Sequence, residues 1–165
     1  MAIGKHRPDP QKSLVGFVVG EVAYAVPISS VKEIINPSML TELPHAPPSV
    51  AGVADHRGEV VPIVDLRVRF GLPRTGDPRR QKWILVDVQR KTVGLAVDRV
   101  TDVFGTGGVD LRPPPALGGG DELRGISGVT SHDGALTFVL DVSQFELLTT
   151  PLGQARMLES VQAPR

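Results

Sequence analysis

Short runs of alternating apolar and polar residues, separated by turns that contain glycine, recur along this chain. Residues 15–19 and 22–26 alternate around Gly20-Glu21, and this period of two predicts a β-hairpin. Residues 83–88 and 92–97 predict another strand pair, and residues 126–129 and 135–140 flank the hairpin turn Asp133-Gly134.

The stretch 50–70 places a polar tip between two apolar segments. Asp55, His56, Arg57 and Gly58 form this tip, where the chain must reverse, so we expect Arg57 to be exposed. After the tip, every second position is apolar, which predicts a strand with one buried face. These positions are Val60, Pro62, Val64, Leu66, Val68 and Phe70.

Two residues set limits on that strand. Pro62 has no amide hydrogen to donate, so we expect it at an edge, at a bulge or at the start of a strand. Asp65 suits the N-cap of a short helical turn that Gly71 would close. Near the other end of the chain, Asp141 or Ser143 is expected to begin a further short helix.

The remaining segments predict short helices and one more strand. Ser29 or Ser30 is expected to cap a helix that runs to Ile35, and residues 100–104 repeat that signal. Residues 40–43 predict a short strand. The 18 glycines and 15 prolines favour frequent turns over long helices. The predicted class is therefore all-β with a few short helices.

The chain also carries an internal repeat. A shift of 76 positions lays VAGVADHRG (50–58) over ISGVTSHDG (126–134), and a shift of 69 lays AVPISSVKEII (25–35) over GLAVDRVTDVF (94–104). Identical or similar pairs include Gly52/Gly128, His56/His132, Asp65/Asp141 and Glu33/Asp102. The repeat predicts two similar lobes that present matched segments to one groove, although shared glycine and β-branched spacing is an alternative explanation.

Composition excludes several classes of protein. The 165 residues are enough for one domain or for two small lobes. The 18 basic and 18 acidic residues balance, so no overall field favours nucleic acid or an anionic membrane. The chain has no cysteine, and no apolar stretch reaches the roughly 18 residues of a membrane span. We expect a soluble intracellular protein that recognises its partners by local shape.

No group of residues marks an active site. The glycine run 118–120 is followed by acidic residues, and Asp77 stands where a phosphate-binding loop would need lysine. The four histidines, His6, His45, His56 and His132, lack the spacing of metal ligands. We therefore expect no enzyme activity, no cofactor and no metal. The basic loop 74–82 leaves open a β-barrel module that binds a small ligand or nucleic acid.

Several motifs resemble the CheW family of bacterial chemotaxis adaptors. They are YAVPISSVKEI at 24–34, HRGEVVPIVDLR at 56–67, VGLAVDRVTDV at 93–103 and LRPPP at 111–115. The resemblance implies one domain, residues 14–148, with flexible tails at 1–13 and 149–165. It also implies a CheW-like, pseudo-duplicated fold of two intertwined five-stranded, SH3-like β-barrel lobes, at about 22–70 and 82–148, which share the first strand.

The resemblance further implies a function without catalysis. Such an adaptor couples the cytoplasmic tip of a methyl-accepting chemoreceptor to the regulatory domain of a CheA-type histidine kinase. It is cytoplasmic, joins membrane receptor arrays through these partners, and requires neither nucleic acid nor membrane insertion. Arg57 matches the arginine implicated in coupling. The other implied receptor-binding positions are Val31, Glu33, Ile34, Val100 and Val103, and further interface candidates are Gly52, Asp55, His56 and Gly58.

The sequence departs from the family pattern at two places. Asp55-His56 stands in place of the usual Asn-Leu, and Pro27 replaces a common aspartate, which leaves open a divergent adaptor in a paralogous pathway. Because His132 is the repeat mate of His56, a structural role is favoured for this histidine. Arg57 has no such mate, since Asp133 takes its position. We therefore assign the arginine to partner coupling.

Overall fold

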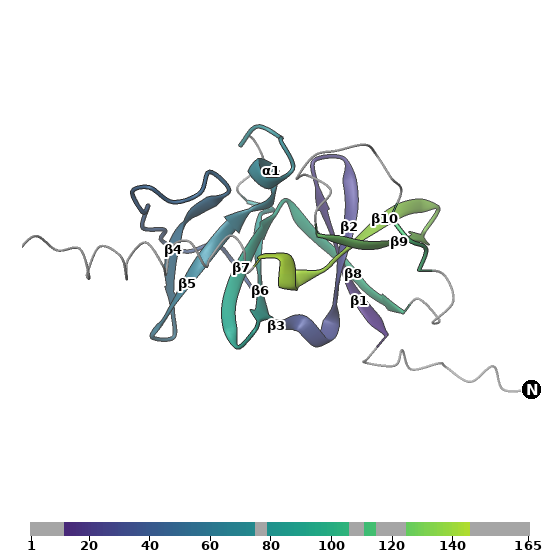
Figure 1. The fold of residues 1–165 in the computed structure, drawn as a ribbon, viewed down its shortest axis with the longest axis horizontal. Coiled ribbons are helices and arrows are strands. Elements are labelled where there is room, and N and C mark those ends of the chain that lie inside the picture. The colour runs from purple at the N-terminus through teal and green to yellow at the C-terminus, as the bar shows by residue number, and fades with distance from the viewer. Residues whose placement is uncertain (1–11, 75–78, 106–110, 115–124, 146–165) are drawn as a thin grey trace, which may run out of the picture.

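The computed structural model consists of two five-stranded sheets and a few short helices (Figure 1). It describes residues 12–74, 79–105, 111–114 and 125–145. The first sheet has the order β8(Arg99–Gly105), β1(Ser13–Val19), β2(Val22–Pro27), β10(Ala135–Leu140) and β9(Ile126–His132). The second has the order β3(Val31–Ile35), β6(Lys82–Val88), β7(Lys91–Val97), β5(Glu59–Asp65) and β4(Val50–His56). The predicted all-β class is confirmed, and we call these sheets A and B.

The two sheets repeat one another in strand order and in register. In sheet A, Gly16 pairs with Ala25, and Ala25 pairs with Val139. In sheet B, the equivalent residues Leu85, Gly94 and Ile63 pair in the same way. The register shifts also recur. One lies between Val15 and Phe17, where β1 pairs with β8, and the other lies between Val31 and Glu33, where β3 pairs with β6. The repeat seen in the sequence is therefore a repeat of structure.

The strands of the two repeats are interleaved. β1 and β2 lie in sheet A, but β3, β4 and β5 from the same half of the chain lie in sheet B. In the second half, β6 and β7 lie in sheet B, whereas β8, β9 and β10 lie in sheet A. The two halves of the chain are intertwined, so the approximate lobe ranges 22–70 and 82–148 do not each form one sheet, because each sheet is completed by strands from the other half. Of the predicted tails, Lys12 and Ser13 belong to the described residues and Ser13 begins β1, while 1–11 and 149–165 lie outside them.

The predicted hairpins are confirmed. The tip of β4 and β5 is a two-residue turn in which Arg57 and Gly58 both have positive φ, 52° and 82°. Asp133 and Gly134 have the same conformation, with φ of 50° and 78°. This pattern suits the right-handed twist of the flanking strands, and glycine adopts it without steric cost.

Two predicted helices are instead strands. Apart from the helical turn η1(Ile28–Ser30), residues 31–35 form β3, and residues 99–105 form β8. The apolar residues Val31, Ile34 and Ile35 are spaced as on one face of a helix, and Val100, Val103 and Phe104 repeat that spacing. In the structure the exposure of β3 nevertheless alternates, and Ile34 is 40% exposed. The predicted strand at 40–43 is also wrong, because Thr41 makes a single bridge, to Val53.

The predicted buried face of residues 60–70 needs correction. Val60 is 65% exposed, whereas Val61 and Ile63 are buried. Val64 and Leu66 are also buried, in the core shared by both sheets, so the last part of β5 is covered on two sides. Pro62 is not at an outer strand. It lies one residue before β5 begins to pair with β7, at Ile63, so its missing amide hydrogen costs no bond there.

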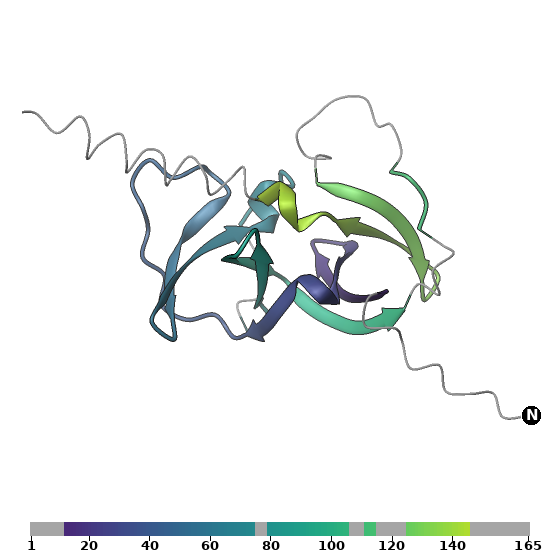
Figure 2. The ribbon, with the colours of Figure 1, turned by 60° about the horizontal axis from the view of Figure 1, so that its bottom comes forward.

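The predicted helix caps are confirmed at both repeats. Asp65 precedes α1(Leu66–Arg69), and its side chain accepts from the amide of Arg67 at 2.9 Å. Gly71 follows this helix with a φ of 76°. Asp141 accepts from the amide of Ser143 at 3.0 Å and so begins η3(Val142–Phe145). Figures 1 and 2 show η3 leaving sheet A for β6 of sheet B.

One hydrophobic core joins the two sheets. It contains Phe17 and Tyr24 from sheet A and Ile84 and Leu95 from sheet B, all buried. The Tyr24 ring stacks on Phe70, at the end of α1, with 4.6 Å between ring centroids. Burial raises the pKa of the Tyr24 hydroxyl above its ordinary value. The lobes are therefore held together by a common interior.

Candidate functional site

The candidate site is the turn at Arg57 together with the edge of β3 that faces it. An Arg57 Nη2 donates to Glu33 Oε1 at 3.1 Å, and His56 Nε2 lies 3.0 Å from Glu33 Oε2. The carboxylate of one edge strand thus meets two side chains from the tip of the other edge strand. Within the turn, the Asp55 carboxylate accepts from the amide of Gly58 at 3.0 Å. The site is therefore a defined cluster on the surface of sheet B.

Exposure separates the two partners of Glu33. The His56 side chain is 23% exposed, but the Arg57 side chain is 76% exposed. An ion pair at such exposure contributes little to stability, because water screens it and the long side chain loses entropy. The guanidinium keeps donors that face solvent, and these can bind carboxylate or carbonyl oxygens of another protein. Arg57 is exposed, as predicted.

The contact between a histidine and an acidic residue of the opposite edge strand recurs in sheet A. His132 Nε2 lies 2.8 Å from Asp102 Oδ2, as His56 lies near Glu33. The histidines therefore join the two outer strands of each sheet, which supports the structural role expected for His56. The turn in sheet A is formed with Asp133 in place of Arg57, so the backbone does not require the arginine.

The other predicted receptor-binding residues are divided between the sheets. Val31 and Val100 are half-buried and pack against the shared core. Ile34 and Val103 are 40% and 51% exposed, on β3 and β8 respectively. Only Ile34 adjoins the Arg57 cluster, through its neighbour Glu33. The roles assigned to these four residues stay predictions.

Gly52 is buried, and its surroundings explain why a glycine is needed. A Cβ atom there would lie 2.5 Å from the carbonyl oxygen of Thr41, which bridges to Val53 and covers the outer edge of β4. At the equivalent Gly128, a Cβ atom would lie 2.8 Å from the Leu111 side chain. Both glycines therefore allow a covering segment to approach an edge strand.

Sequence reasoning missed an exposed apolar pair. Val60 and Leu136 are 65% and 55% exposed and occupy equivalent positions in β5 and β10. The available signal was that the repeat places a valine and a leucine at matched positions. The alternation of residues 60–70 masks this signal, because it predicts that Val60 is buried. Each lobe thus exposes one large apolar side chain at the matched position.

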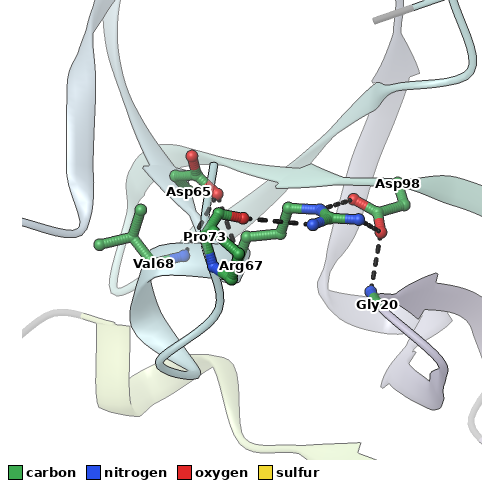
Figure 3. A network of polar contacts seen from close by, with 6 residues as sticks. All are labelled: Gly20, Asp65, Arg67, Val68, Pro73 and Asp98. Atoms are coloured by element: carbon green, nitrogen blue, oxygen red, sulfur yellow. Dashed lines mark hydrogen bonds and ion pairs between the residues drawn. The ribbon is translucent and has the colours of Figure 1, made fainter. Parts of the chain in front are cut away.

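A second missed feature is an ionic network between the lobes (Figure 3). Arg67 of α1 donates to both oxygens of Asp98, at 2.7 and 2.8 Å. The amide of Gly20, in the β1–β2 turn, donates to the same carboxylate at 2.7 Å. The hydrogen bond to Asp98 raises the pKa of the Arg67 guanidinium above its ordinary value. The network ties a helix beside sheet B to a turn of sheet A.

The basic loop gives limited support to a nucleic-acid surface. Arg74 donates to the carbonyl of Pro48 at 3.1 Å, and Lys82 bonds to Asn36, so both are used within the chain. Residues 75–78, with Asp77, and the glycine run 118–120 lie outside the described residues. Within the described part of the chain, none of the helices has the length and apolar character needed to cross a membrane.

Comparison with known proteins bears on the whole domain. Residues 13–146 match the model of the CheW-like domain family. The chain is 33% identical over 138 residues to the chemotaxis protein CheW of Rhizobium meliloti strain 1021, which covers 84% of this chain and 89% of that protein. It is 34% identical over 128 residues to protein FrzA of Myxococcus xanthus, with coverage of 76% and 78%.

The fold also matches a solved structure. The crystal structure of the scaffolding protein TtCheW from Thermoanaerobacter tengcongensis is similar with a TM-score of 0.72 and 27% sequence identity, over 79% of this chain and 88% of that one. The resemblance inferred from the motifs and the predicted CheW-like fold are thereby confirmed. The chain belongs to the CheW family of chemotaxis scaffold proteins.

Proposed function

We propose that this protein is a non-catalytic adaptor that couples the cytoplasmic tip of a chemoreceptor to the regulatory domain of a CheA-type histidine kinase. Arg57 carries the proposal. Its turn needs no arginine, because Asp133 occupies the same conformation in sheet A. Its side chain is nevertheless anchored by Glu33 and largely exposed. An anchored, exposed guanidinium is typical of a binding hot spot.

The proposal includes a location and a pathway. The protein works in the cytoplasm and is recruited to membrane receptor arrays through its two partners. Exposed apolar residues on both lobes, Val60 and Leu136, supply area for protein contacts. We favour chemotaxis over a paralogous pathway, since relatives such as that of Treponema pallidum, 31% identical over 138 residues, are named chemotaxis protein CheW.

Reconstitution with a CheA-type kinase and a receptor signalling fragment tests the proposal. Wild-type protein is expected to bind the kinase regulatory domain and to make kinase activity depend on receptor. Arg57→Ala should keep the wild-type circular dichroism spectrum but lose that dependence. Arg90→Ala is the matched control, because Arg90 is exposed in the other arginine-containing hairpin turn, with φ of 68°.

Two results would contradict the proposal. If the wild-type protein binds neither the kinase domain nor the receptor fragment, the adaptor function is wrong. If Arg90→Ala lowers coupling as much as Arg57→Ala does, the effect is one of surface charge and Arg57 has no specific role. Salt-dependent binding to oligonucleotides would instead favour the nucleic-acid module.

A further inference from the structure

Three side chains that can bind a metal converge at the tip of sheet A. They are Asp102 on β8, His132 at the end of β9 and Asp133 in the following turn. His132 Nε2 lies 2.8 Å from Asp102 Oδ2 and 3.4 Å from Asp133 Oδ2. All three ligand atoms lie within 4.8 Å of one another, so one ion can contact all of them after a small adjustment.

The imidazole is held in place for this role. The Phe104 ring stacks on His132 with 3.6 Å between centroids and 7° between planes. This contact restricts rotation of the ring and keeps Nε2 directed at the two carboxylates. Preorganised ligands lose less entropy on binding than mobile ones do.

At the equivalent position of sheet B, a cationic side chain contacts the carboxylate. In sheet B the equivalent residues are Glu33, His56 and Arg57, and the guanidinium lies 3.1 Å from the carboxylate. In sheet A the arginine is replaced by Asp133, so a histidine meets two carboxylates and the positive charge of that turn is gone. Two carboxylates at this distance repel each other, and a bound cation relieves that repulsion.

Sheet A also leaves space beside these ligands. A cavity of about 240 Å³ is lined by Asp102, His132 and Asp133, and by Gly16 and Thr137. A Cβ atom at Gly16 would lie 2.7 Å from Thr101 Oγ1, so this glycine lets the Thr101 side chain approach β1. In sheet B the positions of Gly16 and Thr137 hold Leu85 and Val61, both buried. Arg99 also lines the cavity and is the one cationic side chain among its described lining residues. There is thus room for water molecules to complete a coordination shell.

We propose that Asp102, His132 and Asp133 bind a divalent transition-metal ion, with Zn²⁺ as the best match. One imidazole nitrogen and two carboxylate oxygens are ligands that Zn²⁺ accepts, and water would supply the fourth. The ion would tie β8 to the β9–β10 turn, as Arg57 and Glu33 tie the edges of sheet B. The site lies in the other sheet from Arg57, but Val103, one of the predicted receptor-binding residues, adjoins Asp102 on β8.

Calorimetric titration of the chelator-treated full chain with ZnCl₂ tests the proposal. Wild-type protein should bind one equivalent with a raised melting temperature. Asp133→Asn and His132→Gln should each weaken that binding by about tenfold or more. Asp133→Arg should abolish it while preserving the melting temperature without metal, because it restores the charge pattern of sheet B. His56→Gln is the matched control and should bind like wild type.

Other results would overturn the site. Absence of saturable binding to wild-type protein excludes it directly. Unchanged binding by Asp133→Arg would show that Asp133 is not a ligand. Equal losses in His56→Gln and His132→Gln would show that the binding is not specific to sheet A. If His132→Gln fails to fold, Asp133→Asn decides the matter, because its side chain is 86% exposed and its loss leaves the fold intact. A Co²⁺ absorption band that Asp133→Arg removes would support the assigned ligands.

Discussion

Arg57 is predicted to contribute little to stability, since it makes one ion pair and its side chain is 76% exposed. Arg57→Ala should lower the free energy of unfolding in urea by less than about 1 kcal/mol, the usual limit for exposed pairs. His56→Ala, which removes the less exposed partner of Glu33, serves as comparison. A loss above about 2 kcal/mol for Arg57→Ala would make the arginine a structural residue.

The two matched glycines are predicted to differ in their tolerance of a methyl group. Gly52→Ala brings a Cβ atom to 2.5 Å from the carbonyl oxygen of Thr41, whereas Gly128→Ala brings it to 2.8 Å from the Leu111 side chain and 3.0 Å from the carbonyl oxygen of Arg112. The closer contact with the backbone is at Gly52. Urea unfolding should show a loss of about 1–3 kcal/mol for Gly52→Ala and a smaller loss for Gly128→Ala. The reverse order would mean that the segment at Thr41 moves aside more easily than the geometry indicates.

At the scale of single residues, the sequence indicated the candidate site but not its contacts. The motif indicated Arg57, and the repeat indicated a structural role for His56. The contact of both with Glu33 joins residues 23 and 24 positions apart across two edge strands, and spacing along the chain carries no information about it. The recurrence of an acid and a histidine in both repeats was the one available signal.

Among the elements, hairpins were predictable and edge strands were not. Most hairpins carry a glycine at the turn, and β6 and β7 are short apolar runs close together in the sequence, so local sequence suffices. β3 and β8 pair across long stretches of chain, and their apolar residues have the spacing of a helix face. The correct assignment depends on a partner strand, which the local pattern does not contain. The intertwined lobes were expected from the family resemblance alone, for the same reason.

Asp98 is predicted to contribute to stability, although it lies in the short connection between β7 and β8. Asp98→Ala removes the acceptor of three hydrogen bonds, from Gly20 and Arg67, at a carboxylate that is 20% exposed. We expect a loss of about 1–3 kcal/mol in urea unfolding, because the donors of Arg67 are left unpaired.

Two further variants test that explanation. Asp98→Asn keeps one oxygen acceptor and should cost less than Asp98→Ala. In a double-mutant cycle, Arg67→Met should have a smaller effect in the Asp98→Ala background than in wild type. Additive effects would show that the two residues do not stabilise each other.

For the whole molecule, one shared core predicts one unfolding transition. Trp83, the single tryptophan, is 2% exposed in sheet B, while Val139 is buried in sheet A. Val139→Ala should lower stability by about 2 kcal/mol and shift the Trp83 fluorescence transition together with the far-UV signal. A fluorescence transition that stays in place would mean that the sheets unfold separately.

Alkaline pH is predicted to weaken the fold through Tyr24. Its pKa is raised by burial, so above the ordinary value of about 10 the unfolded chain loses a proton that the native chain keeps. Stability contributed by the neutral hydroxyl is complete below that pH and falls as pH rises further. Tyr24→Phe should show a shallower decline in melting temperature between pH 9 and 11, and an equal slope would assign the decline to other groups.

The exchange of strands between the sheets has a consequence for ancestry. A chain consisting of β1 to β5 alone would contain two strands of one five-stranded sheet and three strands of the other, so it could form neither sheet in full. Two such chains, however, could complete both by trading segments, in the manner of a domain-swapped homodimer. Fusion of the two genes would turn that dimer into the present single chain. Covalent joining would leave each copy free to diverge, as the two tips have done, since one carries Asp133 and the other Arg57.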